Sequence, residues 1–474
     1  MIKLKQVITQ LNDNDFTRID ESFKKTKADN YSLLFQSYRS GSLSDAEIIK
    51  QLVISSNSFY VLKSRLYDKI QEHLSVDVFS TRENLIKQLL QVPEVCFNMP
   101  RETAIAFLNK LEKELLKFEL HNDLLVVYSA LKKMHLYSEK YFYYSQLFNK
   151  HTAFALSLEK AEEILGNFNR ILGRYNFSRS QQDLDTLYFL NNEIANLYVL
   201  NRSHQIEIIK YFIELQMNLF CEETKGIGTS TVEIIQNMRK IFSELPQTSP
   251  QKKWEIVLDY LAFEYYISIS EYKTALGFYE KVNDNLHTLL LYNNICITSK
   301  FLCTKIKFCD ETDRNEDLLE DPKTIEMLHD SEDSHARVVI AIYNAMLHFK
   351  QKNLKEAINC LNNILNNFSF KDFFHESINV KLTLAYFYLF QKEYELVELT
   401  LKSVSRKIKS EQIEKYYHVL HVIKIFESEM NKTGNAKALA KNKDLFTLFM
   451  ANNKKSNEVL SHLIPELKRK YQML

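Results

Sequence analysis

Two short stretches of this chain carry residue types that could do chemistry. Lys225-Gly-Ile-Gly-Thr-Ser is rich in glycine, and Gly, Lys and Thr are the residues with which a loop cradles a phosphate group. His418 and His421 lie three positions apart, with Glu414 one helical turn upstream, so all three could share one helix face. These stretches raise two possibilities, phosphate binding and zinc binding.

The spacing around these residues supports neither possibility. The glycine-rich stretch lacks the GxxxxGK[ST] order and follows no predicted strand, which favours an interhelical loop. Zinc needs three or four ligands, and the HExxH order is missing near His418. A looser set matches no ligand pattern either: Cys303, Cys309, His329 and His335. With no nucleophile elbow and no paired-carboxylate motif, we predict no catalytic residue, cofactor, metal or small-molecule substrate, and therefore not an enzyme.

The composition restricts the fold to one class. The chain has 474 residues but only 7 Gly and 6 Pro, whereas average usage is about 7% and 5%. Parallel α/β enzymes and β-sandwiches need Gly, Pro or Asn in their turns, because a positive φ is favourable mainly for Gly. We therefore predict an all-α protein in which helix follows helix.

Charge and cysteine content bear on partners and compartment. The net charge of +1 gives no overall basic field for nucleic acid or anionic lipid. No apolar run resembles a signal peptide, and none is long enough to cross a membrane. The 6 cysteines are scattered, as expected for reduced thiols. We therefore expect a cytoplasmic protein that does not bind membranes. Its net charge also argues against nucleic-acid binding.

Apolar residues recur every three or four positions over most of the chain, which is the period of a helix. Most of the few Gly and Pro residues fall between such segments. They predict four regions: an N-terminal helical region at 1–95, helical hairpins at 100–245, repeats at 250–430 and C-terminal capping helices at 435–474. The stretch 310–333 is strongly acidic and has no Gly for a calcium loop, so we predict an exposed acidic insertion.

Three segments in the second half share one pattern of anchor residues. Each has a small or aromatic anchor on a first helix and a small residue on a second, which lets two helix axes approach closely. The anchors are Phe263, Tyr266, Tyr272, Ala275, Tyr279 and Val282; Ala345, His348, Leu354, Ala357, Leu361 and Ile364; and Ala385, Tyr388, Tyr394, Val397, Leu401 and Val404. Each hairpin would leave an apolar face that only its neighbour can cover.

These segments resemble the tetratricopeptide repeat, and Glu271-Tyr-Lys-Thr-Ala-Leu and Asn353-Leu-Lys-Glu-Ala-Ile look like its second helix. Phe263 and His348 depart from the pattern, and no proline closes a unit. The resemblance implies antiparallel helical hairpins stacked as a right-handed superhelix, an α-solenoid.

In that family, first-helix residues line a concave groove that binds a ligand. The resemblance places mostly apolar residues at those positions, which lack the charged donors that a carboxylate needs. We predict a scaffold or adaptor whose groove binds an amphipathic helix or peptide of another protein. The predicted partner-binding residues are Tyr260, Ile342, Met346, Phe349, Leu382, Tyr386 and Leu389. Equally, the apolar tail at 441–474 could fill the groove from within the chain.

The N-terminal region offers an alternative function. Ser44 and Glu47 form a predicted capping box, and a second predicted helix follows from Phe59, so the pair resembles a helix-turn-helix. Lys63, Arg65 and Lys69 could meet phosphates, although neighbouring acidic residues offset their charge. The alternative is therefore a transcriptional regulator that binds DNA through this segment.

Overall fold

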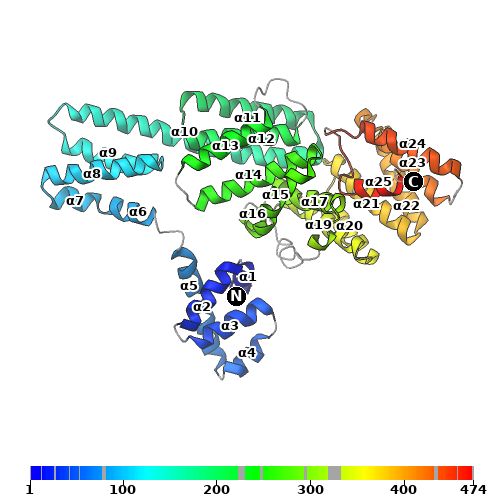
Figure 1. The fold of residues 1–474 in the computed structure, drawn as a ribbon, viewed down its shortest axis with the longest axis horizontal. Coiled ribbons are helices and arrows are strands. Elements are labelled where there is room, and N and C mark those ends of the chain that lie inside the picture. Colours follow the sequence, from blue (N-terminus) through cyan, green and yellow to red (C-terminus); the bar gives the residue numbers. More distant parts are fainter. Residues whose placement is uncertain are drawn as a thin grey trace. The chain divides into compact units, whose positions relative to one another are not determined.

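The computed structural model describes most of the chain. The described residues are 2–11, 13–25, 28–41, 43–52, 54–76, 82–221, 230–245, 249–292, 296–318, 333–410, 412–431, 436–455 and 457–471. Every regular element among them is a helix, so the predicted all-α class is confirmed (Figure 1). The chain divides into two compact units, Met1–Ala155 with Pro246–Pro250, and Leu156–Leu245 with Gln251–Leu474.

The first unit consists of short helices with two separate apolar clusters. Its helices are α1 (Ile2–Gln10), α2 (Asp13–Lys25), α3 (Asp29–Ser40), α4 (Asp45–Leu52), α5 (Ser56–Val76), α6 (Arg82–Leu90), α7 (Val92–Asn98), α8 (Arg101–Lys117), α9 (His121–Met134) and the first part of α10 (Lys140–Ser178). Helices α1 to α5 bury one cluster, and α6 to α10 bury the other. Each cluster forms because the helices present apolar residues on one face only.

Polar contacts fix the helix ends in this unit. The predicted capping box is confirmed: the Ser44 backbone N–H donates to Glu47 Oε2 at 2.8 Å, and the Glu47 N–H lies 3.4 Å from Ser44 Oγ. At the end of α1, the Arg39 guanidinium donates to three carbonyl oxygens at 2.7–3.2 Å. These carbonyls have no partner within their own helix, so the arginine satisfies them.

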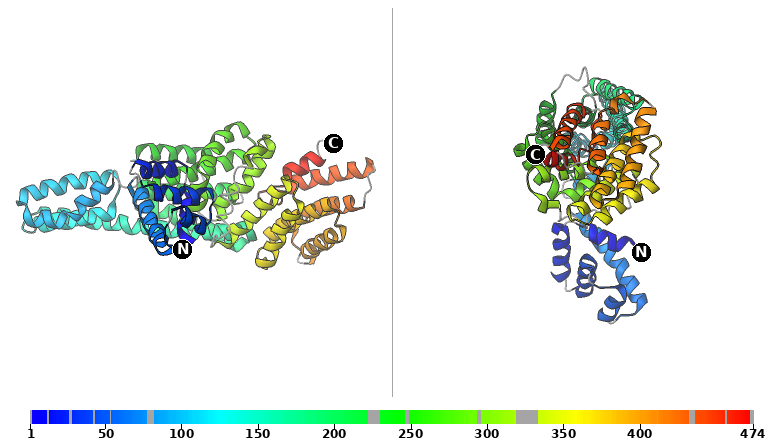
Figure 2. Two further views of the ribbon diagram at one scale, coloured as in Figure 1. Left: turned by 90° about the horizontal axis from the view of Figure 1, so that it is seen from below. Right: turned by 90° about the vertical axis from the view of Figure 1, so that its right-hand side faces the viewer.

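The second unit packs consecutive helices side by side (Figures 1 and 2). Its further helices are α11 (Gln181–Leu200), α12 (His204–Phe220), α13 (Thr231–Glu244), α14 (Ser249–Ser268), α15 (Tyr272–Asp284), α16 (Leu286–Tyr292), α17 (Cys296–Glu311), η1 (Asn315–Leu318), α19 (Ser334–Lys350), α20 (Leu354–Asn367), α21 (Phe374–Gln391), α22 (Tyr394–Ser410), η3 (Glu414–Tyr416), α23 (Val419–Met430), α24 (Ala436–Asn452) and α25 (Ile464–Tyr471). One continuous apolar core runs through this unit.

The small anchors predicted from the repeat pattern lie where helices meet. Ala345 on α19 and Ala357 on α20 have no exposed surface, and neither has Ala385 on α21 or Val397 on α22. The helices α19 and α20 pack together, as do α21 and α22. Small side chains at these positions allow the close approach, and larger apolar neighbours fill the space around them.

Three hairpins of this unit share the same turn. Ser270, Lys352 and Lys392 have φ values of 61°, 62° and 64°, and each lies two residues before the next helix begins. In each turn the following backbone N–H donates to a carbonyl five residues earlier, at 2.9, 2.8 and 3.1 Å. This is the Schellman geometry that usually requires glycine. The chain thus builds its hairpin turns with serine and lysine, which explains how it folds with so few glycines.

The strain in these turns predicts a stabilising substitution. A left-handed residue other than glycine costs about 1–2 kcal/mol, and glycine loses about 0.5–1 kcal/mol more backbone entropy on folding. Lys352→Gly and Lys392→Gly should each therefore raise the free energy of unfolding by about 0.5–1 kcal/mol. The measurement is the shift in calorimetric melting temperature.

Lys402→Gly is the matched control, because Lys402 lies inside α22 with an exposed side chain. There, glycine should lower the free energy of unfolding by about 1 kcal/mol. A loss of stability at Lys352 and Lys392 as large as at Lys402 would contradict the strained-turn interpretation.

Candidate functional site

The seven residues predicted to line a groove lie on three helices of the second unit. Tyr260 is on α14; Ile342, Met346 and Phe349 are on α19; Leu382, Tyr386 and Leu389 are on α21. Five of them are at most 2% exposed, whereas Phe349 and Leu389 are partly buried against the same core. The structure therefore does not show them as an open apolar surface.

Members of this set on different helices meet only in part. The rings of Phe349 and Tyr386 lie 5.8 Å apart and join α19 to α21. Tyr260 instead packs its ring against Phe301 of α17, at 6.1 Å. The part of the predicted groove that forms one site is therefore the part built by α19 and α21.

The chain's own C-terminal segment covers this site. We name residues 457–471 the C-terminal strap; it ends in the short helix α25, drawn in red in Figure 1. Its apolar side chains join the same core and are at most 4% exposed: Val459, Leu460, Leu463, Ile464, Leu467 and Tyr471. The C-terminal strap is therefore packed into the core of the second unit, whereas the filling of a groove by the tail at 441–474 stays a prediction.

Specific hydrogen bonds hold the strap against α21. The Leu460 backbone N–H donates to Asn379 Oδ1 at 2.8 Å, and His462 Nε2 lies 2.8 Å from Thr383 Oγ1. The Thr383 hydroxyl donates its proton to the backbone carbonyl oxygen of Asn379, 2.7 Å away. In the contact between Thr383 and His462, His462 Nε2 is therefore the donor. Buried polar pairs of this kind fix the register of the strap, which apolar packing alone would leave less defined.

Acidic residues surround the basic end of α25. Lys468 Nζ lies 3.5 Å from Glu311 Oε1, and Arg469 Nη2 lies 3.4 Å from Asp310 Oδ1. Lys470 Nζ lies 2.7 Å from Glu429 Oε2. We name Asp310, Glu311 and Glu429 the acidic rim.

Two rim residues come from the acidic stretch 310–333 that was predicted to be an exposed insertion. Its described part, 310–318, holds both exposed and buried residues, so exposure of the whole stretch stays a prediction. Residues 310 and 311 complete α17, residues 315–318 form η1, and the Asp310 side chain is fully buried in ion pairs with Lys350 and Arg469. Residues 319–332 lie outside the described residues. Fixed cations explain the burial, because a buried carboxylate needs paired charge.

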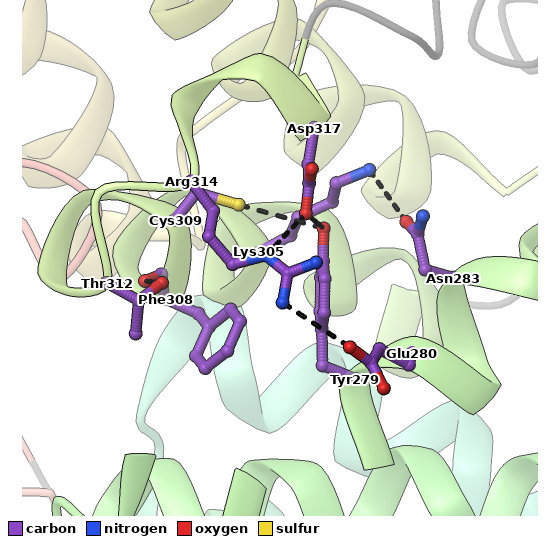
Figure 3. Close-up of polar contacts among 9 residues, drawn as sticks. All are labelled: Tyr279, Glu280, Asn283, Lys305, Phe308, Cys309, Thr312, Arg314 and Asp317. Atoms are coloured by element: carbon purple, nitrogen blue, oxygen red, sulfur yellow. Dashed lines mark hydrogen bonds and ion pairs between the residues drawn. The ribbon is translucent and has the colours of Figure 1, made fainter. Parts of the chain in front are cut away.

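A polar cluster next to the rim anchors the chain after α17 (Figure 3). The Tyr279 hydroxyl donates to Asp317 Oδ2 at 3.0 Å, and Arg314 Nε donates to the same oxygen at 3.0 Å. Arg314 also reaches Glu280 Oε1, at 3.4 Å. Burial, with Cys309 and Asp317 beside it, raises the pKa of Tyr279, which therefore stays a neutral donor. The cluster ties η1 to α15 and α17, and so holds the end of α17 in place.

The ammonium group of Lys470 lies in a cage of aromatic rings. Its Nζ is 5.7 Å from the ring centre of Tyr386, 5.5 Å from that of Phe390 and 5.6 Å from that of Tyr471. Glu429 completes the cage and also accepts a hydrogen bond from the Tyr471 hydroxyl. We name Tyr386, Phe390, Tyr471 and Glu429 the lysine cage. Of its members, only Tyr386 was predicted from the sequence.

The candidate chemical residues do not assemble into a site. No group of three or more His, Cys, Asp or Glu side chains that could hold a metal is found in the described part of the chain. His418 Nε2 lies 3.2 Å from Asn453 Oδ1, and its ring stacks on Phe449. Cys309 lies 3.7 Å from the Tyr279 hydroxyl, whereas Cys303 faces the Val339 carbonyl. His329 and residues 225–229 of the glycine-rich stretch lie outside the described residues.

One of the three cations of the DNA-binding alternative is held within the first unit. Lys63 Nζ lies 3.0 Å from Asp45 Oδ2, and its side chain is only 12% exposed. Arg65 and Lys69 are exposed, and Lys69 Nζ lies 6.0 Å from the ring centre of Tyr31. The ion pair makes Lys63 less available to a phosphate, and DNA binding through the other two residues stays a prediction.

Comparison of the chain with models of protein families, with curated proteins and with solved structures finds no match. Within the described ranges, no helix is both long and apolar enough to cross a membrane. Five cysteines form no disulfides with one another: Cys96, Cys221, Cys303, Cys309 and Cys360.

The Tyr279 cluster predicts a loss of stability on removal of one hydroxyl group. Tyr279→Phe should lower the free energy of unfolding by about 1–3 kcal/mol, because the lost hydrogen bond goes to a charged group. Amides 310–318 should also exchange hydrogen faster. Tyr266→Phe is the matched control, since no hydrogen bond from its hydroxyl to another described residue is found and its ring packs on Phe278. Equal effects of the two substitutions would contradict this role of Tyr279.

The burial of His462 predicts that the strap loosens in acid. Burial lowers the His462 pKa from 6.5 to about 4, so the docked strap binds fewer protons than the released strap between these pH values. Docking is therefore fully favourable above pH 6.5 and weakens as the pH falls towards 4. Hydrogen exchange of strap amides, corrected for the intrinsic rate, should rise at pH 5 relative to pH 7.5. His462→Gln keeps a donor without titrating, so an unchanged pH dependence in this variant would contradict the prediction.

Proposed function

We propose that this protein is a non-enzymatic scaffold or adaptor with a tetratricopeptide-like superhelix, which binds an amphipathic helix of another protein. The partner would occupy the site on α19 and α21 that the C-terminal strap fills here. The observation that carries the proposal is the strap itself: its short helix α25 buries apolar side chains in the core, and Leu460 and His462, which precede that helix, make hydrogen bonds to α21. Such a helix in a groove is a known mode of peptide recognition.

The helical stack supports the proposal in two ways. The hairpins share one turn geometry at Ser270, Lys352 and Lys392, and their small anchors are buried, as a repeat architecture requires. The unit also presents several helices to one ligand, since the strap contacts side chains of α17, α19, α21 and α23. A cytoplasmic location is part of this proposal and agrees with the lack of a disulfide among Cys96, Cys221, Cys303, Cys309 and Cys360.

The test is binding of the strap as a separate peptide. Leu467→Asp in the full chain should release α25, because Leu467 is 1% exposed and a buried unpaired carboxylate is costly. A labelled synthetic peptide of residues 457–474 should then bind the variant saturably, as measured by fluorescence anisotropy. The unmodified chain should bind it at least about a hundredfold more weakly, because its own strap competes at an effective concentration in the millimolar range.

Two controls make the result decisive. A peptide with Leu467→Asp should not bind, and circular dichroism should show that the receiving chain keeps its helices. Lys470→Glu provides a second receiving chain, because it opposes Glu429 at a partly exposed position and leaves the apolar core intact. If neither folded receiver binds the peptide, the proposed function is wrong.

A further inference from the structure

The site that the C-terminal strap occupies has charged residues in a defined pattern as well as buried apolar residues. The three carboxylates of the acidic rim and the ammonium of Lys350 give the receiving side a formal net charge of −2. Lys468, Arg469, Lys470 and Glu466 give α25 a formal net charge of +2. The opposing charges are aligned, because each basic residue of α25 meets a different rim residue. Complementary charge of this kind selects between ligands more than it adds affinity.

Two carboxylates of the acidic rim are held by ion pairs and hydrogen bonds, so they cannot rearrange freely to suit another ligand. Asp310 is fully buried and ion-paired with Lys350, which also lies 3.5 Å from Glu466. Glu429 is mostly buried and is shared between Lys470 and Tyr471. A ligand without a cation at this point would leave the Glu429 carboxylate without its ion pair, which is more costly than a missing apolar contact.

The lysine cage suits an ammonium group in particular. Three rings lie at similar distances, 5.5–5.7 Å, from the Lys470 Nζ, and a carboxylate oxygen lies at 2.7 Å. Aromatic faces attract a cation most strongly when it is partly withdrawn from water. A compact ammonium can satisfy the rings and the carboxylate together, whereas the planar guanidinium of arginine prefers a two-oxygen contact.

We infer that the site on α19 and α21 selects a basic amphipathic helix of a partner protein, read through a lysine that enters the lysine cage. This inference rests on the proposed function and names its partner class. The partner helix carries an apolar residue three positions before the caged lysine, as Leu467 precedes Lys470, and an aromatic residue directly after it, as Tyr471 does. Since Tyr471 belongs to the strap, the partner supplies that wall of the cage.

The inference is tested by measuring how variants of the 457–474 peptide bind to the full-length Leu467→Asp and Lys470→Glu chains. Relative to the 457–474 peptide, Lys470→Ala in the peptide should weaken binding about tenfold or more. Lys470→Arg should weaken it less, because the charge is kept. Lys468→Ala is the matched control and should cost about twofold, since its ion pair with Glu311 is partly exposed at 3.5 Å. Affinity for the unmodified peptide should also fall as salt rises.

The outcomes separate the inference from the proposed function. Equal binding of the Lys470→Ala and unmodified peptides would overturn the lysine cage while leaving the scaffold function standing. No binding of any peptide would overturn both. If the unmodified chain forms dimers that excess peptide dissociates, the occupant is the strap of a second copy, and a partner protein is the wrong assignment.

A measurement on the intact chain needs no peptide. Glu429→Gln and Lys470→Ala should each speed hydrogen exchange in α25 by about tenfold relative to the unmodified chain. Together they should do little more than either alone, because both remove the same interaction. Fully additive effects would show that Glu429 and Lys470 act independently and would overturn the cage.

Discussion

The apolar face of a helical hairpin has to be covered, and the organisation of the second unit follows from this constraint. Each hairpin from α19 onward buries its face against the next one, so the core continues from helix to helix. The last hairpin, α23 and α24, packs against α21, where the ring of Phe426 lies 5.8 Å from that of Tyr386. The C-terminal strap then adds its own apolar side chains to this end of the core, and it is therefore a structural part of the core as well as, in the proposed function, the model for a ligand.

This double role limits how tightly the strap can be held. Apolar contacts such as Leu467 favour permanent closure, whereas a binding site has to open. The polar contacts of α25 are of the kind that can be exchanged: its basic side chains are partly exposed, so water and salt weaken their ion pairs. The strap thus combines buried apolar side chains with a partly exposed basic end, and its ion pairs rather than its apolar contacts are the ones that solvent weakens.

The fold class could be predicted because it depends on local information. Helical periodicity and the shortage of Gly and Pro are properties of short windows, and the buried anchors Ala345, Ala357 and Ala385 confirm the pattern in the structure. Three hairpin turns of the second unit were harder to predict, because their residues with positive φ are Ser270, Lys352 and Lys392 and none of these is glycine. Surrounding packing overrides the local preference there, which no propensity could indicate.

The site was predicted less well because its contacts join distant residues. Leu460 meets Asn379 across 81 positions, and Lys468 meets Glu311 across 157. The repeat spacing placed Tyr386 on a face of α21 that the structure buries, but it carries no information about which segment covers that face. For the same reason the burial of Asp310 could not be predicted, since its partners Lys350 and Arg469 are far away in the sequence.

The same long-range contacts explain why a single site can combine apolar and charged recognition. Helix α21 supplies the rings of Tyr386 and Phe390, whereas α23 supplies the carboxylate of Glu429 and α17 those of Asp310 and Glu311, so the aromatic and the acidic groups come from different helices. A helix that binds there must match all three at once. A purely apolar helix would cover the apolar residues of the site but leave the Glu429 carboxylate without a counter-ion. A helix with charged residues alone would leave those apolar residues exposed to water. The proposed specificity for a basic amphipathic helix therefore depends on how the stack brings its helices together rather than on any one helix.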